Sequence, residues 1–366
     1  MRSLLRLSVL ASLSLVVSTC GDGGSGPTGP AGGFPSKLAF TVPPSAATAG
    51  AVLSPALQVT VQDAQGNPVT SSTASITLAL TSGTGTAGAL LGGTLTRAAV
   101  NGVATFSDLT LDKAGVGYTL TATASALTSA TSNAFAVSAA AATSVAKQAG
   151  DGQSAPVGSP VATPPAVIVK DAFNNPKPGA SVTFAVASGG GTITGANQTT
   201  DAGGIAAVGS WTLGAAGTNT LTATVSGSGI SGNPVTFTAT ATIVAANVAV
   251  FVGNNQSGLV GYAVNIRPAV RVTDGVGGPV SGQSVTFAVA SGGGSVTSAT
   301  VNTNSNGVAQ VGSWVLGAAG ANTLTATVSG AGIAGNPLTF TATGNDRKST
   351  RLNSSHSRAS RMPSSA

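Results

Sequence analysis

The strongest constraint on this chain is an internal duplication with a fixed offset. The segment VTFAVASGGG begins at Val182 and again at Val285, 103 residues later, and the segments GSW, LTATVSG and GNP recur at the same offset. Residues 180–240 and 283–343 are identical at 44 of 61 positions without a gap. Solenoid repeats are only about 20 to 50 residues long and depend on their neighbours. The longer period therefore predicts two copies of one self-sufficient folded unit.

A third, diverged copy precedes these two. Each copy contains an Asp followed five residues later by Pro, at Asp63, Asp171 and Asp274, with spacings of 108 and 103 residues. Each copy then continues with a strand-like segment, a segment that begins with Gly, and a closing segment of the type LTATxS. The chain is therefore expected to hold three domains, over residues 36–138, 139–243 and 244–344.

Alternation of apolar and polar residues indicates the fold class. Only 7% of the residues are charged, 42% are hydrophobic, and apolar residues alternate with Thr and Ser. In residues 181–186, Val182, Phe184 and Val186 point to one face of a strand and the intervening residues to the other. About seven such short strands per hundred residues, separated by turn signals, predict an all-β fold of three tandem immunoglobulin-like β-sandwiches.

The large aromatic residues fit this interpretation. Trp211 and Trp314 occupy matching positions of the duplicated segments, and each is predicted to fill the centre of its sandwich. The alternative is an exposed surface on which a sugar ring stacks, which would make the two tryptophans a glycan site. Tyr118 is a candidate for the corner tyrosine of such sandwiches, although the later copies have Asn219 and Asn322 near that place.

The N-terminal residues read as an export signal. Residues 1–20 combine Arg2 and Arg6 with a short apolar stretch and end at Cys20, the one cysteine of the chain. The sequence before Cys20 resembles the bacterial lipobox, which implies that the thiol is acylated and anchors the protein in a membrane. Ordinary secretion with a leftover thiol is the alternative. Residues 21–35 are rich in Gly, Pro and Ser and are predicted to be a flexible tether.

The C-terminal residues differ abruptly from the rest. From Asp346 onward the Gly, Ala, Thr and Val texture gives way to DRKSTRLNSSHSRASRMPSSA, which resembles a translated sequencing adapter with an index-sized gap. Residues 345–366 are therefore interpreted as a disordered, non-native tail, and the natural protein is expected to continue past Gly344.

The order of motifs resembles that of a known family. The pattern VxVxDxxGNPVxGxxVTF, then a strand led by Gly, then LGxAGxxTLTATxS, is similar to the bacterial Ig-like repeats of invasin- and intimin-type surface proteins, over about residues 36–344. The resemblance implies a rod of sandwiches that positions an adhesive module. Host or envelope proteins, or glycans, are the partners that it implies.

Candidates for chemistry are few. The single His is His356 in the tail, and the chain has no Glu, so no catalytic residues, zinc ligands or cofactor site are predicted. Calcium would require oxygen ligands around Asp63, Asp171 and Asp274, whereas each precedes a turn that its carboxylate can cap. Gly189, Gly190 and Gly191 are interpreted as a flexible strand connection rather than a phosphate-binding loop.

The charge distribution and the motifs together lead to one functional hypothesis. The formal net charge is +6, but the excess of Lys and Arg lies in the leader and in the last 21 residues, so nucleic-acid binding is not predicted. The chain is expected to be a non-catalytic, lipid-anchored stalk or adhesin at the outer membrane or cell surface. A polysaccharide-binding module, and accessory domains of an enzyme truncated after Gly344, are the alternatives.

Overall fold

A computed structural model describes residues 33–346 of the chain. These residues form β-strands and turns, and no helix of a length and hydropathy suited to crossing a bilayer is present among them. The predictions for the leader, for the acylation of Cys20 and for the tail lie outside the described residues.

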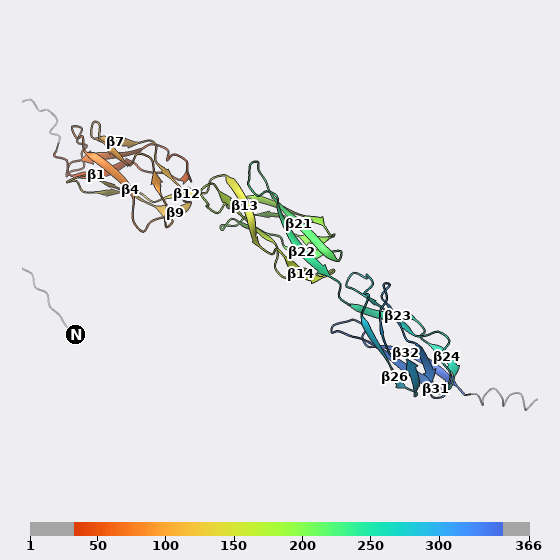
Figure 1. Cartoon of the computed structure of the whole chain (residues 1–366). Helices are drawn as coiled ribbons and strands as arrows, with labels where there is room; N and C mark the ends of the chain where they lie inside the picture. Colours follow the sequence, from red (N-terminus) through yellow and green to blue (C-terminus); the bar gives the residue numbers. More distant parts are fainter. Residues whose placement is uncertain (1–32, 347–366) are drawn as a thin grey trace, which may run out of the picture.

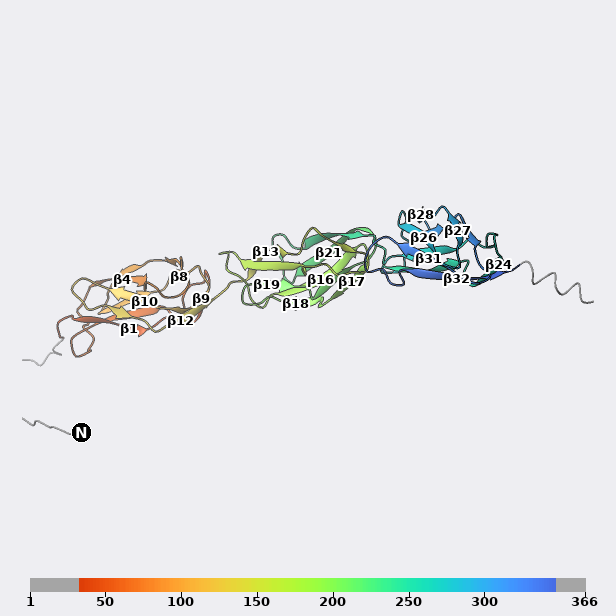
Figure 2. The same cartoon turned by 90° about the horizontal axis from the view of Figure 1, so that it is seen from below.

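The strands fall into three groups, which we call units 1, 2 and 3. Figures 1 and 2 show the three units end to end in the order of the sequence, in two perpendicular views. Unit 1 contains β1 (Lys37–Val42), β2 (Ala47–Thr48), β3 (Leu57–Gln62), β4 (Ser75–Leu80), β5 (Leu91–Gly92), β6 (Thr96–Ala98), β7 (Val103–Phe106), β8 (Thr110–Leu111), β9 (Gly115–Tyr118), β10 (Leu120–Thr123), β11 (Ala130–Thr131) and β12 (Phe135–Ser138). Unit 2 contains β13 (Ala142–Ala149), β14 (Gln153–Pro156), β15 (Ala166–Asp171), β16 (Ser181–Ser188), β17 (Gly191–Thr194), β18 (Asn197–Thr199), β19 (Ile205–Ala207), β20 (Ser210–Leu213), β21 (Gly217–Val225) and β22 (Val235–Thr242). Unit 3 contains β23 (Asn247–Val252), β24 (Gln256–Leu259), β25 (Ala269–Thr273), β26 (Ser284–Ser291), β27 (Gly294–Thr297), β28 (Thr300–Asn302), β29 (Val308–Gln310), β30 (Ser313–Leu316), β31 (Gly320–Val328) and β32 (Leu338–Asn345).

Units 2 and 3 have the same sheet order. In unit 2 a three-stranded sheet, β13-β15-β19, accompanies a five-stranded sheet, β14-β22-β21-β16-β18, and the short pair β17-β20. Unit 3 repeats this with β23-β25-β29, β24-β32-β31-β26-β28 and β27-β30. In both larger sheets the last strand of the unit pairs in parallel with an early strand, β22 with β14 and β32 with β24.

The core of unit 2 lies between its sheets, as the alternation of residues predicts. Phe184, Trp211 and Leu221 are buried in one hydrophobic cluster, together with Val182. On β21 the buried residues alternate with threonines that lie toward solvent. Unit 3 and unit 1 each have a separate cluster of this kind. The predictions that Phe184 points inward and that Trp211 lies in the core of its sandwich are therefore confirmed.

Unit 1 departs from its neighbours at one strand. Where unit 2 has the continuous strand β21, unit 1 has β9 and β10, separated at Thr119. Strand β9 pairs with β12, whereas β10 pairs with β4 and β11. The sheet is consequently split into β2-β12-β9 and β11-β10-β4-β6.

The glycine run that leads into β17 is enclosed at one end. Gly189, Gly190 and Gly191 all have positive φ, at 81°, 70° and 85°. A Cβ on Gly191 would lie 2.2 Å from the carbonyl oxygen of Thr212. The neighbouring strand therefore leaves no room for a side chain at Gly191, whereas an added Cβ on Gly190 would meet no atom within 4 Å.

Candidate functional site at the junctions between units

The three aspartates of the repeated motif cap their own turns. The Asp63 carboxylate accepts hydrogen bonds from the backbone N–H groups of Gln65 and Asn67, at 3.0 and 2.8 Å. Asp274 accepts equivalent bonds from Val276 and Gly278 at 3.1 and 2.7 Å. The turn interpretation is confirmed for both residues.

Asp171 makes the same bonds and one more. It accepts hydrogen bonds from the backbone N–H groups of Phe173 and Asn175, and its second oxygen accepts from Ala140 in the segment that joins units 1 and 2, at 2.9 Å. Burial raises the pKa of the Asp171 carboxyl, but the hydrogen bonds from Asn175, Ala140 and Phe173 outweigh burial and hold that pKa below its ordinary value. Asp171 is therefore ionised when it holds the connecting segment through the bond from Ala140.

Calcium is the alternative partner of the carboxylates of Asp63, Asp171 and Asp274. Their oxygens face N–H donors, and no three His, Cys, Asp or Glu side chains of residues 33–346 come together as metal ligands would.

Each unit has a polar corner at the start of its closing strand. The Tyr118 hydroxyl is fully buried and donates to the carbonyl oxygen of Lys113 at 2.8 Å, which is the hydrogen bond expected of a corner tyrosine. At the matching position of unit 2, the Asn219 side chain donates to the carbonyl of Ala215 and accepts from the N–H of Gly214. Asn322 does the same in unit 3. The amide therefore replaces the phenol at one structural corner.

The two tryptophans lie in the cores and present no ring to solvent. Trp211 and Trp314 are both 0% exposed, and the backbone of each accepts a hydrogen bond, from Val161 and Val264 respectively. In unit 1 Leu109 accepts the equivalent bond from Leu53, so a leucine stands where the later units have tryptophan. A sugar-stacking surface needs an exposed ring face, and the glycan site at Trp211 and Trp314 is therefore contradicted by their burial.

The turn that Asp171 caps carries an aromatic residue into unit 1. Phe173 packs against the hydrophobic cluster of unit 1. Its ring covers Gly50, where an added Cβ would lie 2.2 Å from the ring atom Cζ. Gly50 has a positive φ of 75°. The absent side chain is what allows the ring to approach this backbone.

Hydrogen bonds reinforce the same contact. The Asn175 side chain donates to the carbonyl oxygen of Asp112 at 2.8 Å and accepts from the N–H of Ala114 at 3.1 Å. The Lys113 ammonium donates to the carbonyl oxygen of Phe173 at 2.9 Å. Asn175 is buried, and its second N–H bonds to Asp171. The junction between units 1 and 2 is thus a fixed contact of one aromatic ring and three hydrogen bonds.

The junction between units 2 and 3 uses the same positions with smaller residues. Val276 stands where unit 2 has Phe173, and Gly278 stands where unit 2 has Asn175. Val276 contacts Gly158, whose added Cβ would lie 2.7 Å from Val276 Cγ1, but the valine remains 62% exposed. Gly278 has no side chain with which to bridge the units. This contact therefore lacks both the ring and the amide of the first junction.

At both junctions, a residue of the following unit packs on a glycine at the equivalent position of the unit before it. The N–H groups of Gly50, Gly158 and Gly261 donate to the carbonyl oxygens of Leu111, Leu213 and Leu316 respectively. All three have positive φ, between 75° and 82°. The sequence signal for this contact is the second and fourth residues after the motif aspartate, Phe and Asn in DAFNNP against Val and Gly in DGVGGP, which periodicity alone does not single out.

The sheet order, the enclosed cores and the polar corners define each unit as an immunoglobulin-like β-sandwich. Residues 162–240 match the model of the family described as bacterial Ig-like domain (group 1). The resemblance to bacterial Ig-like repeats is thereby confirmed for unit 2, and unit 3 repeats the sequence of unit 2 over this region.

Several solved structures are similar to the chain. The Escherichia coli adhesin FdeC is 21% identical, with a TM-score of 0.52 over 84% of this chain and 96% of that one. Invasin, described as a bacterial integrin-binding protein, is 20% identical with a TM-score of 0.37 over 85% of this chain and 60% of that one. The Yersinia pseudotuberculosis adhesin InvE is 22% identical, with a TM-score of 0.26 over 55% and 58%. No curated protein matches by sequence.

Proposed function

We propose that this chain is a non-catalytic stalk of the bacterial cell envelope, of the adhesin type, built from three domains over residues 36–138, 139–243 and 244–344. The observation that carries the proposal is the docking of each unit onto a glycine of the unit before it, Phe173 on Gly50 and Val276 on Gly158. Because the same kind of contact recurs between successive domains, the domains are arranged in a line, and an elongated arrangement is what a spacer requires.

The relatives support the adhesin type. FdeC is described as an adhesin, and its fold similarity extends over most of both chains. The residues also support a role without chemistry, because the acidic residues outside the tail are scattered aspartates and there is no Glu. The partners would be host or envelope proteins or glycans, bound by a module that the stalk positions.

Small-angle X-ray scattering of residues 33–346 tests the linear arrangement. The longest strands have nine residues, which at about 3.3 Å per residue gives a sandwich a length of about 30 Å, so three in line span about 100 Å and have a radius of gyration of about 30 Å. A compact particle of this size would have a radius of gyration of about 19 Å. A value near the lower figure would contradict the stalk.

The anchoring at Cys20 is the second part of the proposal, and the sequence around Cys20 supports it. Metabolic labelling with a radioactive fatty acid should mark the parent protein and leave Cys20→Ser unlabelled, and the variant should move from the membrane fraction to the soluble fraction. Equal labelling of the two proteins would contradict the anchoring at Cys20 and would leave the stalk proposal unaffected.

A further inference from the structure

The two junctions differ in the bonds that cross them. At the first junction, between units 1 and 2, the Asn175 side chain and the Lys113 ammonium form three hydrogen bonds from one unit to the other. At the second junction, between units 2 and 3, residues 33–346 contain no hydrogen bond, ion pair or strand pairing that joins the two units. The contact of Val276 with Gly158 is therefore one of packing without a directional bond.

The segments that connect the units differ in the same way. In the first connector, residues 139–141, Ala139 is buried and its carbonyl oxygen accepts a hydrogen bond from the Lys177 ammonium at 3.3 Å. In the second connector, residues 243–246, Ile243 and Val244 are 54% and 47% exposed, and neither forms a hydrogen bond with another described residue. No bond therefore restricts rotation about the backbone dihedral angles of these two residues.

Open space beside the contact is common to both junctions. A cavity of about 690 Å³ lies between units 1 and 2, where Val116 and Pro176 are among the lining residues. A cavity of about 590 Å³ lies between units 2 and 3, and Leu213 and Pro279 are among the residues that line it. Space for tilting is therefore available at each junction, and the bonds across the junction decide whether one unit can tilt against the other.

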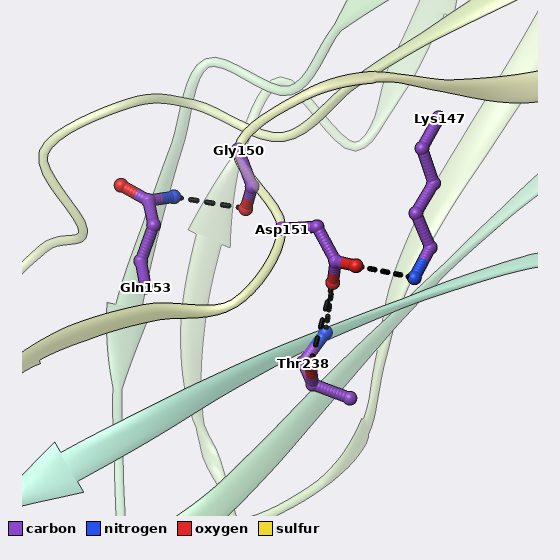
Figure 3. A network of polar contacts seen from close by, with 5 residues as sticks. All are labelled: Lys147, Gly150, Asp151, Gln153 and Thr238. Carbon is purple, nitrogen blue, oxygen red and sulfur yellow. Dashed lines mark hydrogen bonds and ion pairs between the residues drawn. The ribbon is translucent and has the colours of Figure 1, made fainter.

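Within a unit, by contrast, the two sheets are fastened to each other. In unit 2 the chain passes from β13 in one sheet to β14 in the other through a turn that contains Asp151. Figure 3 shows the Asp151 carboxylate paired with the Lys147 ammonium of β13 and accepting the N–H of Thr238, on β22, at 2.8 Å. Unit 3 keeps the second of these bonds, from Thr341 to Asn254, at 2.8 Å. Each unit therefore moves as one body, and bending falls on the connectors.

We propose that the second junction is a hinge, on which unit 3 pivots against a stiff base formed by units 1 and 2. Relative motion is the default for two domains of one chain unless the interface between them is large and hydrophobic. At the first junction Phe173 packs on the hydrophobic cluster of unit 1 and Asn175 bonds to its backbone, whereas the second junction has Val276 and Gly278 at these positions.

The hinge gives the proposed stalk one movable joint. Unit 3 can take several directions while units 1 and 2 keep it at a distance from the N-terminal end of the stalk. This use rests on the proposed function, but the hinge itself rests only on the contacts of the second junction.

Pulsed electron spin resonance on the whole chain compares the two junctions. With Cys20 replaced by serine, spin labels on cysteines at Ser75 and Thr236 span the first junction, and labels at Thr236 and Thr339 span the second. All three labelled positions are exposed. The distance distribution across the second junction should be broader than the distribution across the first. Distributions of equal width would overturn the hinge.

Exchanging the two turn residues tests whether they set the stiffness. Val276→Phe with Gly278→Asn gives the second junction the residues of the first. The introduced amide would meet the backbone of Gly214 and Ala216, which line the cavity of the second junction and stand where unit 1 has the partners of Asn175. This double variant should narrow the distribution across the second junction to the width found for the first.

The reverse exchange is the matched control. Phe173→Val with Asn175→Gly gives the first junction the residues of the second, and it should broaden the distribution across the first junction while circular dichroism shows the units still folded. If both exchanges left the distributions of the parent protein unchanged, these contacts would not set the stiffness and the proposal would fail.

Limited proteolysis of the unmodified chain gives an independent measurement. Elastase cleaves after small apolar residues, which both connectors contain, and it should cut residues 243–246 at least about tenfold faster than residues 139–141, because cleavage follows the population of exposed, unbonded backbone. Mass spectrometry should therefore find units 1 and 2 still joined after unit 3 has been released. Release of unit 1 first would overturn the hinge without contradicting the linear arrangement, which the scattering measurement tests separately.

Discussion

Replacing Phe173 by alanine should loosen the junction between units 1 and 2 while leaving both units folded. A buried phenylalanine covers about 150–250 Å², and Phe173 is half-buried. Truncation therefore returns about 100 Å² of apolar surface to water, which at about 25 cal/mol per Å² amounts to about 2.5 kcal/mol. This free energy corresponds to a roughly 60-fold increase in the population of undocked arrangements.

The matched control is Val276→Ala at the second junction. Val276 is already 62% exposed and loses fewer carbon atoms, so this change should weaken its junction by less than about 1 kcal/mol. Spin labels on cysteines at Ser75 and Thr236, both exposed, report the separation of units 1 and 2 in a Cys20→Ser background.

Pulsed electron spin resonance should give a narrow distance distribution for the parent protein and a broad one for Phe173→Ala. Val276→Ala should leave the distribution narrow, because it changes a junction that the labels do not span. A narrow distribution for Phe173→Ala, with both units folded by circular dichroism, would refute the reasoning.

Three other changes test the cores, the corner and the capped turn. Trp211→Ala removes a fully buried ring and should lower the unfolding free energy of unit 2 by about 3–5 kcal/mol. Denaturant titration of the variant and of the parent protein measures this difference. Tyr118→Phe removes the hydroxyl that bonds to Lys113 and should cost unit 1 about 1 kcal/mol, whereas a phenylalanine as stable as the tyrosine would argue against the corner. The pKa of Asp171 is lowered in the folded chain, so the stability it contributes is complete above the unfolded value of about 3.9 and disappears as the pH falls through the folded value. Thermal melts between pH 6 and 2.5 should therefore show a smaller loss for Asp171→Asn than for the parent protein, and parallel curves would contradict this.

The elements that repeat in sequence are those that the sequence predicted well. Alternation along residues 181–186 placed Phe184 inward, and the matching positions of the two tryptophans placed Trp211 in the same core. Side-chain direction in a strand has a period of two, so these assignments need only local information. The turn role of the motif aspartates was equally local, because an Asp caps backbone N–H groups two and four residues ahead.

Contacts across units were beyond the same reasoning. Phe173 and Asn175 read as ordinary turn residues, because their partners Gly50 and Asp112 lie more than sixty residues earlier. Periodicity assigns residues to the faces of a sheet and gives no information about its edges. The position of the apolar residues Val250, Phe251 and Val252 on the outermost strand β23 could therefore not be predicted.

The parallel pairing of β14 with β22 decides how unit 2 responds to tension. A pull on the chain from its two ends draws β14 toward the N-terminus and β22 toward the C-terminus. Parallel strands loaded in this way slide along each other, so the pairs from Gln153 with Ala239 to Pro156 with Thr242 bear the load together rather than one after another. Unit 3 repeats this arrangement with β24 and β32. Unit 1 has a shorter parallel pairing of β2 with β12, through two residue pairs, and a chain pulled from both ends would load it together with these two ladders.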